Sequence, residues 1–334
     1  MMTHGADIYT YAKLAGCKPE QMIDFSSNIN LYQPSMQLDT ASHHIERYAD
    51  SSYASLKTAI ANNYEIKPSQ IALYNGATAA IYALFSQLKP KKVYLYAPLY
   101  GEYQKAAFRA KKFVSKINRI DDIENPPSKN SIVVFVNPST PEGEHYNLDA
   151  LLKMWMKRKC TIILDESFLE FEALKSYRNE IQNYKKLYII QSFSKFYSCA
   201  GVRVGAVFAH KKSIEKLSKE LWNISSLDVT FLEQRLNDTT FKEYSRKLHK
   251  EQKEELQKIL EECGHFDEIV PSDANFILCY NPRGKELFEH LLTHKILVRS
   301  CESFDYLSEN WLRFAIKDKN AHKELQKTLE LFSR

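Results

Sequence analysis

SFSKFYSCAGVRVG, residues 192–205, follows a run of apolar residues and contains the side chains best suited to chemistry. Lys195 stands in a short loop after a predicted buried strand, with Ser192 and Ser194 just before it and Arg203 after it. A lysine at a strand end can form a Schiff base with an aldehyde cofactor. Hydroxyls and a guanidinium nearby suit a phosphate dianion. The alternative is an exposed loop with an ordinary surface lysine and arginine.

Alternating strand-like and helical segments surround this loop. Short, continuous apolar runs predict strands at residues 71–75, 91–98, 131–138, 160–166, 187–194 and 202–210. Amphipathic or apolar periodicity predicts helices at residues 56–66, 77–88, 148–158, 213–222 and 229–262. Buried strands separated by helices favour a mostly parallel sheet that is covered on both faces, so the fold class is α/β. The tail from residue 266 predicts a smaller α+β unit.

Three further motifs lie at the ends of predicted strands. VFVNPSTPEG, residues 134–143, forms a rigid proline loop in which Asn137 can aim one amide. Asp165 ends a strongly apolar strand, where a carboxylate needs a cation or a donor such as a protonated pyridine nitrogen. In YNGATAA the chain turns at Gly76 into a helix whose first N–H groups, with the Thr78 hydroxyl, offer an anion site. Each motif alone is also typical of an ordinary turn.

Composition excludes several classes of protein. Only nine of the 334 residues are glycine, which excludes glycine-rich, collagen-like and low-complexity chains. Interspersed charges with a net value of +5 indicate a solvated surface, so no nucleic-acid partner is expected. No apolar run approaches the roughly 20 residues that cross a bilayer, so no membrane association is expected. Six scattered cysteines without a CxxC pair favour free thiols in the cytoplasm and give no indication of a metal site.

The four motifs occur along the chain in the order phosphate turn, asparagine, aspartate, lysine and arginine. With this order, the chain resembles the fold-type I pyridoxal-phosphate enzymes of the class I/II aminotransferase superfamily over nearly its whole length. The resemblance implies an aspartate aminotransferase-like fold. Its large domain, residues 45–225, would contain a mostly parallel seven-stranded sheet, and residues 1–44 and 226–334 would form a smaller α+β domain. A homodimer with active sites at its two-fold interface is also implied.

The resemblance assigns roles in binding pyridoxal 5'-phosphate. Lys195 would form the Schiff base and move the proton at the substrate carbon, Asp165 would keep the pyridine nitrogen protonated, and Asn137 would donate to the phenolic oxygen. Tyr100 or Tyr103 would stack on the ring, and Tyr100 is favoured. The residues that match the cofactor's phosphate cup are Gly76, Ala77, Thr78, Ser192, Ser194 and Arg203, together with Tyr48 of the neighbouring subunit.

Within the family, the chain most resembles the threonine-phosphate decarboxylases of cobalamin-type pathways. The opening segments HGADIYTYAKLAG (4–16) and MIDFSSNIN (22–30), DESFLEF (165–171) and the lysine loop carry this resemblance. Phe168 stands where the related histidinol-phosphate aminotransferases usually have tyrosine. The implied reaction is decarboxylation of L-threonine O-3-phosphate or O-phosphoserine.

The same resemblance implies substrate-binding residues. Arg313 matches the arginine that binds the substrate carboxylate. The candidates for binding the substrate's phosphate are His4, Ser27, Asn28 and Arg299. A surface ion pair is the alternative role for Arg299, and an ordinary terminal residue is the alternative for His4.

Two other functions remain open from the sequence. A histidinol-phosphate-type aminotransferase would share every cofactor residue, and a non-catalytic binding protein could share the fold. Ala79 stands where the family commonly has glutamate, which removes a carboxylate near the phosphate turn. The intact Lys195 argues against the non-catalytic alternative.

Overall fold

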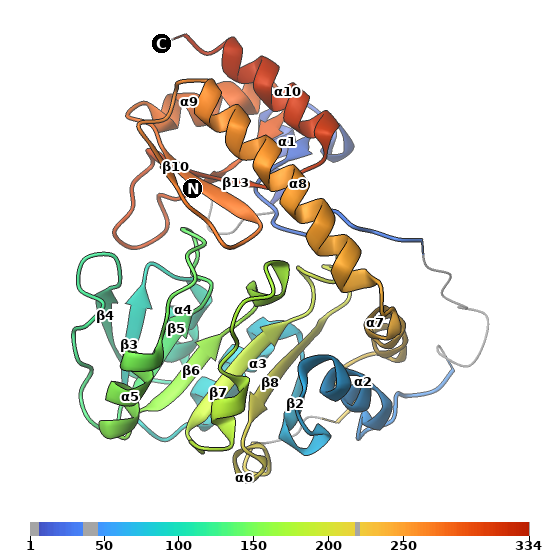
Figure 1. The fold of residues 1–334 in the computed structure, drawn as a ribbon, viewed down its shortest axis with the longest axis vertical. Coiled ribbons are helices and arrows are strands. Elements are labelled where there is room, and N and C mark those ends of the chain that lie inside the picture. Colours follow the sequence, from blue (N-terminus) through green and yellow to red (C-terminus); the bar gives the residue numbers. More distant parts are fainter. Residues whose placement is uncertain (1–6, 36–45, 218–220, 334) are drawn as a thin grey trace.

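The computed structural model describes residues 7–35, 46–217 and 221–333 (Figure 1). A seven-stranded sheet has the order β2-β8-β7-β6-β5-β3-β4. Its strands are β2 (Ile71–Asn75), β3 (Lys92–Ala97), β4 (Phe113–Asn118), β5 (Ile132–Val136), β6 (Thr161–Asp165), β7 (Leu187–Ser192) and β8 (Val204–Ala209). Strands β3 to β7 pair in parallel, whereas β8 runs antiparallel to β7 and β2. The predicted α/β class and mostly parallel sheet are confirmed.

Both faces of this sheet are buried at its central strands, and β5 (IVVFV) is apolar at every position. In β5, Val133 and Phe135 point into one core while Ile132, Val134 and Val136 point into the other. The first core is closed by α2 (Ala54–Tyr64), α5 (Asp149–Lys157) and α7 (Ser226–Asn237), and the second by α3 (Gly76–Gln87), α4 (Glu102–Arg109) and α6 (Lys211–Ile214).

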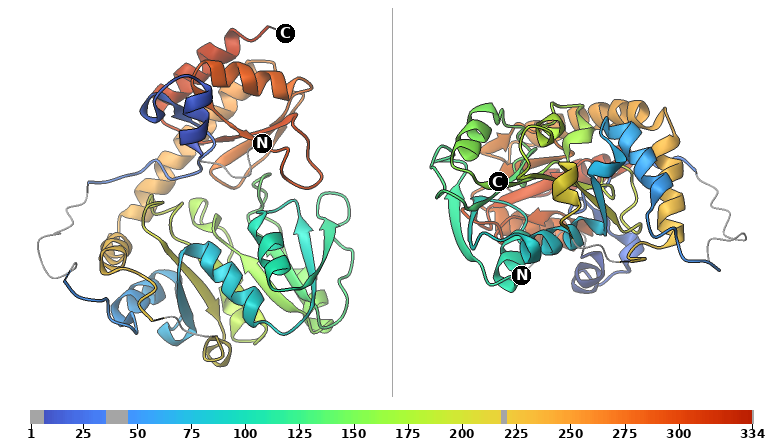
Figure 2. Two further views of the ribbon diagram at one scale, coloured as in Figure 1. Left: turned by 180° about the vertical axis from the view of Figure 1, so that it is seen from behind. Right: turned by 90° about the horizontal axis from the view of Figure 1, so that it is seen from below.

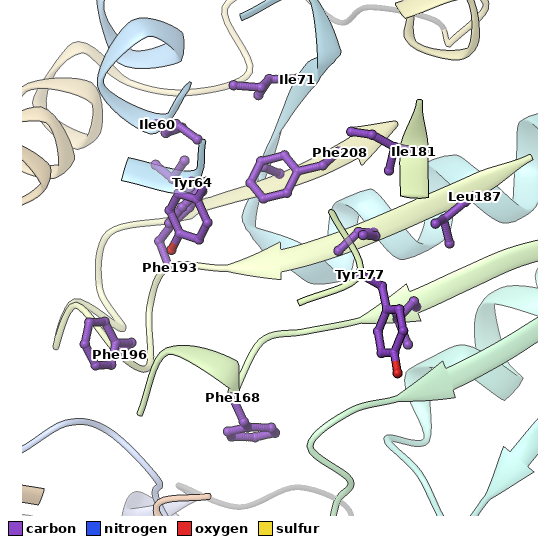
Figure 3. Close-up of a cluster of buried hydrophobic side chains, with 14 of the residues drawn as sticks. Ile60, Tyr64, Ile71, Phe168, Tyr177, Ile181, Leu187, Phe193, Phe196 and Phe208 are labelled. Carbon is purple, nitrogen blue, oxygen red and sulfur yellow. The ribbon is translucent and has the colours of Figure 1, made fainter. Parts of the chain in front are cut away.

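Aromatic rings join the first core to the candidate lysine loop. Tyr64 of α2 lies with its ring centroid 5.8 Å from that of Phe193 and 5.4 Å from that of Phe208 (Figure 3). Phe196 packs edge-on against Phe171 at 5.2 Å. The loop after β7 is therefore held in place by aromatic rings that pack against Phe193 and Phe196.

A second unit lies beyond the carboxyl edge of the large sheet (Figures 1 and 2). Its antiparallel sheet has the order β12-β13-β10-β9, formed by β9 (Glu268–Val270), β10 (Phe276–Tyr280), β12 (Arg299–Ser300) and β13 (Trp311–Ala315). Three helices pack on it: α8 (Phe241–Glu262), α9 (Gly284–Thr293) and α10 (Lys319–Glu330). Helix α8 runs from one unit to the other.

The N-terminal segment belongs beside this second unit. Strand β1 (Ile23–Asp24) pairs in parallel with β11 (Ile296–Leu297), and α1 (Ile8–Leu14) packs near it through Tyr11 and Ala12. We propose the division that the sequence implies, with residues 45–225 as the large domain and the remainder as the small domain, with the difference that α7 packs in the first core of the large sheet. No helix in the described ranges is long and apolar enough to cross a membrane.

Two predicted helices were wrong in extent. The helix expected at 229–262 is two helices, α7 and α8, because the Asp238 side chain accepts hydrogen bonds from Thr240 N at 3.0 Å and Thr240 Oγ1 at 2.7 Å. The helix expected at 213–222 is instead α6, residues 211–214, although residues 218–220 lie outside the described part. Helix α4 and the edge strand β4 were not predicted.

The start of α3 packs unusually close to β8. A Cβ atom on Gly205 would lie 2.3 Å from Ala77 N, whereas a Cβ atom on Gly201 would have nothing within 4 Å. We predict that Gly205→Ala destabilises the protein by about 1–3 kcal/mol, because β8 or the α3 turn must shift. Gly201→Ala, the matched control, changes stability little. Denaturant unfolding measures both; equal stability of the two variants would contradict the packing described.

Candidate active site

A cavity of about 360 Å³ opens at the carboxyl edge of the large sheet and is lined by residues of both units. This volume lies in the range typical of small-molecule sites. Twelve of the predicted site residues line it: Ser27, Asn28, Ala77, Thr78, Tyr100, Asp165, Ser192, Ser194, Lys195, Arg203, Arg299 and Arg313. Segments far apart in the sequence are thus brought to one site.

The Lys195 amine lies in the cavity, three residues beyond the end of β7. Its Nζ is 4.5 Å from the centroid of the Phe168 ring. Desolvation lowers the pKa of Lys195, and the nearby Asp165 charge partly opposes this effect. Because only the neutral amine is nucleophilic, this lysine is better suited than a surface lysine to attack an aldehyde.

The carboxylate of Asp165 is fixed by two donors. Its Oδ1 accepts from Ser167 N at 2.9 Å, and its Oδ2 accepts from the Tyr103 hydroxyl at 2.6 Å. Burial and the adjacent carboxylate raise the pKa of Tyr103, so the tyrosine remains a donor. The ionised group can also face a cationic ring nitrogen in the cavity.

Of the two tyrosines considered for ring stacking, only Tyr100 lines the cavity. Tyr103 lies in the first turn of α4, on the face packed against the sheet, and is completely buried. These positions favour Tyr100 for the proposed ring stacking, whereas Tyr103 supports Asp165 from behind.

The role of Asn137 stays a prediction, because its amide nitrogen carries two hydrogens and only one of them has a partner within the loop. Its side chain closes the proline loop on itself, donating to Tyr146 O at 3.0 Å and accepting from Tyr146 N at 2.8 Å. Asn137 does not line the cavity, whereas Thr140, three residues later in the same loop, does. Thr140 Oγ1 accepts from Arg313 Nη1 at 3.1 Å. Thr140 is therefore a further site residue in this loop that faces the cavity, and no signal in the sequence indicated it.

An anion cup lies at one end of the cavity. Ala77 and Thr78 lie in the first turn of α3, and the Ser192 and Ser194 hydroxyls are 3.0 Å apart. Arg203 packs directly over Gly76, where a Cβ atom would come within 2.6 Å of Nη2. Gly76 itself does not line the cavity. Helix-terminal N–H groups, hydroxyls and a guanidinium together suit a phosphate.

Two arginines face the cavity from the small domain. Arg299 on β12 and Arg313 on β13 are direct partners in the antiparallel register, and both are buried. Burial lowers the pKa of Arg313 to about 10. Among the described residues, Arg313 Nε has no hydrogen-bond partner. Like charges directly opposite each other are destabilising, so the pair favours an anion between them.

The remaining predicted residues have different positions. Ser27 and Asn28 line the cavity, and their carbonyls accept from Lys317 Nζ and Asn275 Nδ2, each at 2.8 Å. Tyr48 does not line the cavity of its own chain. His4 lies outside the described residues.

Sequence reasoning missed several cavity residues besides Thr140, namely Ser26, Ser167, Ser303 and Phe304. Ser26 and Ser167 lie within motifs that were singled out for neighbouring residues. Ser303 and Phe304 come shortly after the predicted strand that contains Arg299. This closeness to Arg299 in the sequence was the one feature that could have indicated them.

Comparisons with known proteins agree with this geometry. Residues 20–329 match the family model "Aminotransferase class I and II". The adenosylcobalamin biosynthesis bifunctional protein CobDQ of Leptospira interrogans is 30% identical over 96% of this chain, which spans 40% of that protein's length. The threonine-phosphate decarboxylase of Salmonella typhimurium is 25% identical over 96% of this chain and 94% of its own length. The histidinol-phosphate aminotransferase of Clostridium acetobutylicum superposes with a TM-score of 0.82 and 28% identity, covering 92% of this chain and 98% of that one.

The chain belongs to the class I and II aminotransferase family. Its members are pyridoxal-phosphate enzymes, and pyridoxal 5'-phosphate is the cofactor of this protein. The cavity fits that molecule, because it combines a desolvated amine at Lys195, a carboxylate at Asp165 and an anion cup around Arg203. When bound, the cofactor supplies an electron-withdrawing ring.

We predict that Lys195 in the cofactor-free protein titrates below the ordinary lysine value of 10.5. Since the Asp165 charge raises the pKa of Lys195, Asp165→Asn should lower it further. NMR titration of the labelled lysine amine measures both values. A pKa at or above the ordinary value, or an increase in Asp165→Asn, would contradict the electrostatics described.

Proposed function

We propose that this protein is a cytoplasmic decarboxylase of a phosphorylated amino acid, L-threonine O-3-phosphate or O-phosphoserine. The observation that carries the proposal is the pair Arg299 and Arg313, directly opposed in the cavity that holds Lys195. Such a substrate has one amino group and two anionic groups. The amino group would meet the Lys195 side of the cavity, and the carboxylate and phosphate would meet the two guanidinium groups.

Two further features support this choice. The relatives include a threonine-phosphate decarboxylase and an adenosylcobalamin biosynthesis protein. Phe168, which packs against the Lys195 amine, has no hydroxyl where the related aminotransferases usually have one. All six cysteines are free thiols, which supports a reducing compartment such as the cytoplasm.

In this proposal each residue has a defined task. Arg313, held by Thr140 and Ser26 O, binds the carboxylate, and Arg299 binds the phosphate. Asp165 would face the cofactor's ring nitrogen, and the cup around Arg203 would bind the cofactor's phosphate. The bond between Cα and the carboxylate breaks, CO2 leaves, and Lys195 delivers a proton to Cα. The product is an amino-alcohol phosphate.

A histidinol-phosphate-type aminotransferase is the second candidate. The 28% identity to the Clostridium acetobutylicum aminotransferase, across nearly both chains, favours it. Histidinol phosphate has no carboxylate. In an aminotransferase, one arginine of the pair would therefore bind the carboxylate of the second substrate, a 2-oxo acid, instead.

Separate assays with O-phospho-L-threonine, O-phospho-L-serine and histidinol phosphate test the proposal. We expect CO2 release from a phosphorylated amino acid without added 2-oxoglutarate, and Arg313→Lys should reduce kcat/KM by about ten- to a hundred-fold because a bidentate carboxylate contact is lost. Lys195→Ala serves as the inactive control. Glutamate formation from 2-oxoglutarate with histidinol phosphate, and no CO2 release, would contradict decarboxylation.

We also propose that the chain acts as a homodimer in which Tyr48 reaches the partner's cofactor phosphate. Tyr48 is 81% exposed and stacks on Trp222 with ring centroids 4.9 Å apart, which supports a surface that a second subunit covers.

Mixing subunits tests this sharing of sites. Tyr48→Ala should weaken cofactor binding by about ten-fold through loss of a phosphate contact. Refolded mixtures of Tyr48→Ala and Lys195→Ala should regain activity, because one site of each hybrid has both residues. A monomeric protein, or mixtures no more active than the separate variants, would exclude the shared site.

A further inference from the structure

The loop between β12 and β13, residues 301–310, projects from the small domain toward β4 of the large domain (Figures 1 and 2). Hydrogen bonds from Phe304 N to Cys301 O and from Leu307 N to Phe304 O fold it into consecutive turns. Cys301 N donates to Trp311 O at 2.9 Å and closes its base. The loop is therefore folded on itself and closed at its base.

This loop completes the surroundings of Arg299. Ser303 Oγ accepts from Arg299 Nη2 at 2.7 Å, and the Phe304 ring centroid lies 5.4 Å from the Arg299 guanidinium. Both residues line the cavity. Ser303 thus adds a hydroxyl, and Phe304 an apolar wall, where Arg299 lines the cavity. A guanidinium beside a hydroxyl is a typical arrangement for holding a phosphate.

One ion pair joins the tip of the loop to the other domain. Lys116 Nζ lies 2.5 Å from Asp305 Oδ1, and their side chains are 29% and 34% exposed. Lys116 belongs to β4, the edge strand of the large sheet, and Asp305 follows Phe304 directly. The contact therefore ties residues 303 and 304 to the rigid sheet. Neither charged side chain lines the cavity.

We propose that the Lys116–Asp305 ion pair is an interdomain latch that positions Ser303 and Phe304 beside Arg299, and that Ser303 belongs to the subsite for the substrate's distal phosphate. Lys116 and Asp305 are positioning residues and do not touch the substrate. The assignment of the phosphate rests on the proposed function, whereas the latch itself rests only on the structure.

Charge reversal and charge exchange test the latch. Lys116→Glu and Asp305→Lys each remove the attraction, and the double variant restores it with opposite polarity. Lys129→Glu, at an exposed lysine of the large domain, changes the net charge by the same amount as Lys116→Glu and is the control for that variant. All proteins are studied with bound pyridoxal phosphate. Hydrogen exchange reports on the amides of residues 301–310, and the cofactor's visible absorption reports binding of O-phospho-L-threonine and of L-threonine.

We expect each single reversal to accelerate exchange in the loop and to weaken O-phospho-L-threonine binding by about five-fold, the upper end for a partly exposed pair. The double variant should restore both properties to within two-fold, and L-threonine binding should stay unchanged throughout. Ser303→Ala should weaken binding of the phosphorylated ligand without accelerating exchange.

Unchanged exchange in both single variants would overturn the latch. Faster exchange with unaltered O-phospho-L-threonine binding, or an equal loss of L-threonine binding, would overturn its role at a phosphate subsite. If the wild-type protein binds no phosphorylated amino acid, the proposed function and the phosphate subsite fail together. The exchange data alone then decide whether the latch exists.

Discussion

Parallel pairing of β5, β6 and β7 forces the chain to leave the sheet repeatedly at one edge. Asp165 ends β6 in register with Val136 of β5 and Ile190 of β7, so the loops after these strands begin side by side. The antiparallel strand β8 begins at this same edge, directly after Arg203, and pairs at Val204 with the last residue of β2. The start of α3 must therefore lie there too. The strand order alone assembles the lysine, the carboxylate and the anion cup.

Desolvation then gives this edge its chemical character. Among the residues that the structure describes, the cavity is lined by Lys195, Arg203, Arg299 and Arg313 but by a single carboxylate, that of Asp165. Burial lowers the pKa of Lys195 and of both small-domain arginines. A cationic cavity of this kind is costly when empty and is stabilised by anions, which a phosphorylated cofactor and a phosphorylated amino acid both provide. Anions in the cavity therefore stabilise both domains, since each domain contributes cations to its lining.

Much of the architecture could be predicted from the sequence, because the central strands are short apolar runs bounded by turn residues. The edge strand β4 was missed because it is polar and mostly exposed. The individual side chains were harder to place. Asn137 and Thr140 share one loop, and only its folded path shows that the amide turns back to Tyr146 while the hydroxyl faces Arg313. Tyr103 was ambiguous because it stands only three residues after Tyr100 in the sequence. In the fold, Tyr100 lines the cavity and Tyr103 lies behind Asp165.

Covalent labelling of the lysine tests the central claim most directly. The protein with bound pyridoxal phosphate is reduced with borohydride, digested and examined by mass spectrometry. We predict a single pyridoxyl-phosphate adduct on Lys195, and its absence after prior removal of the cofactor. An adduct at another lysine, or none in protein that retains the cofactor, would contradict it.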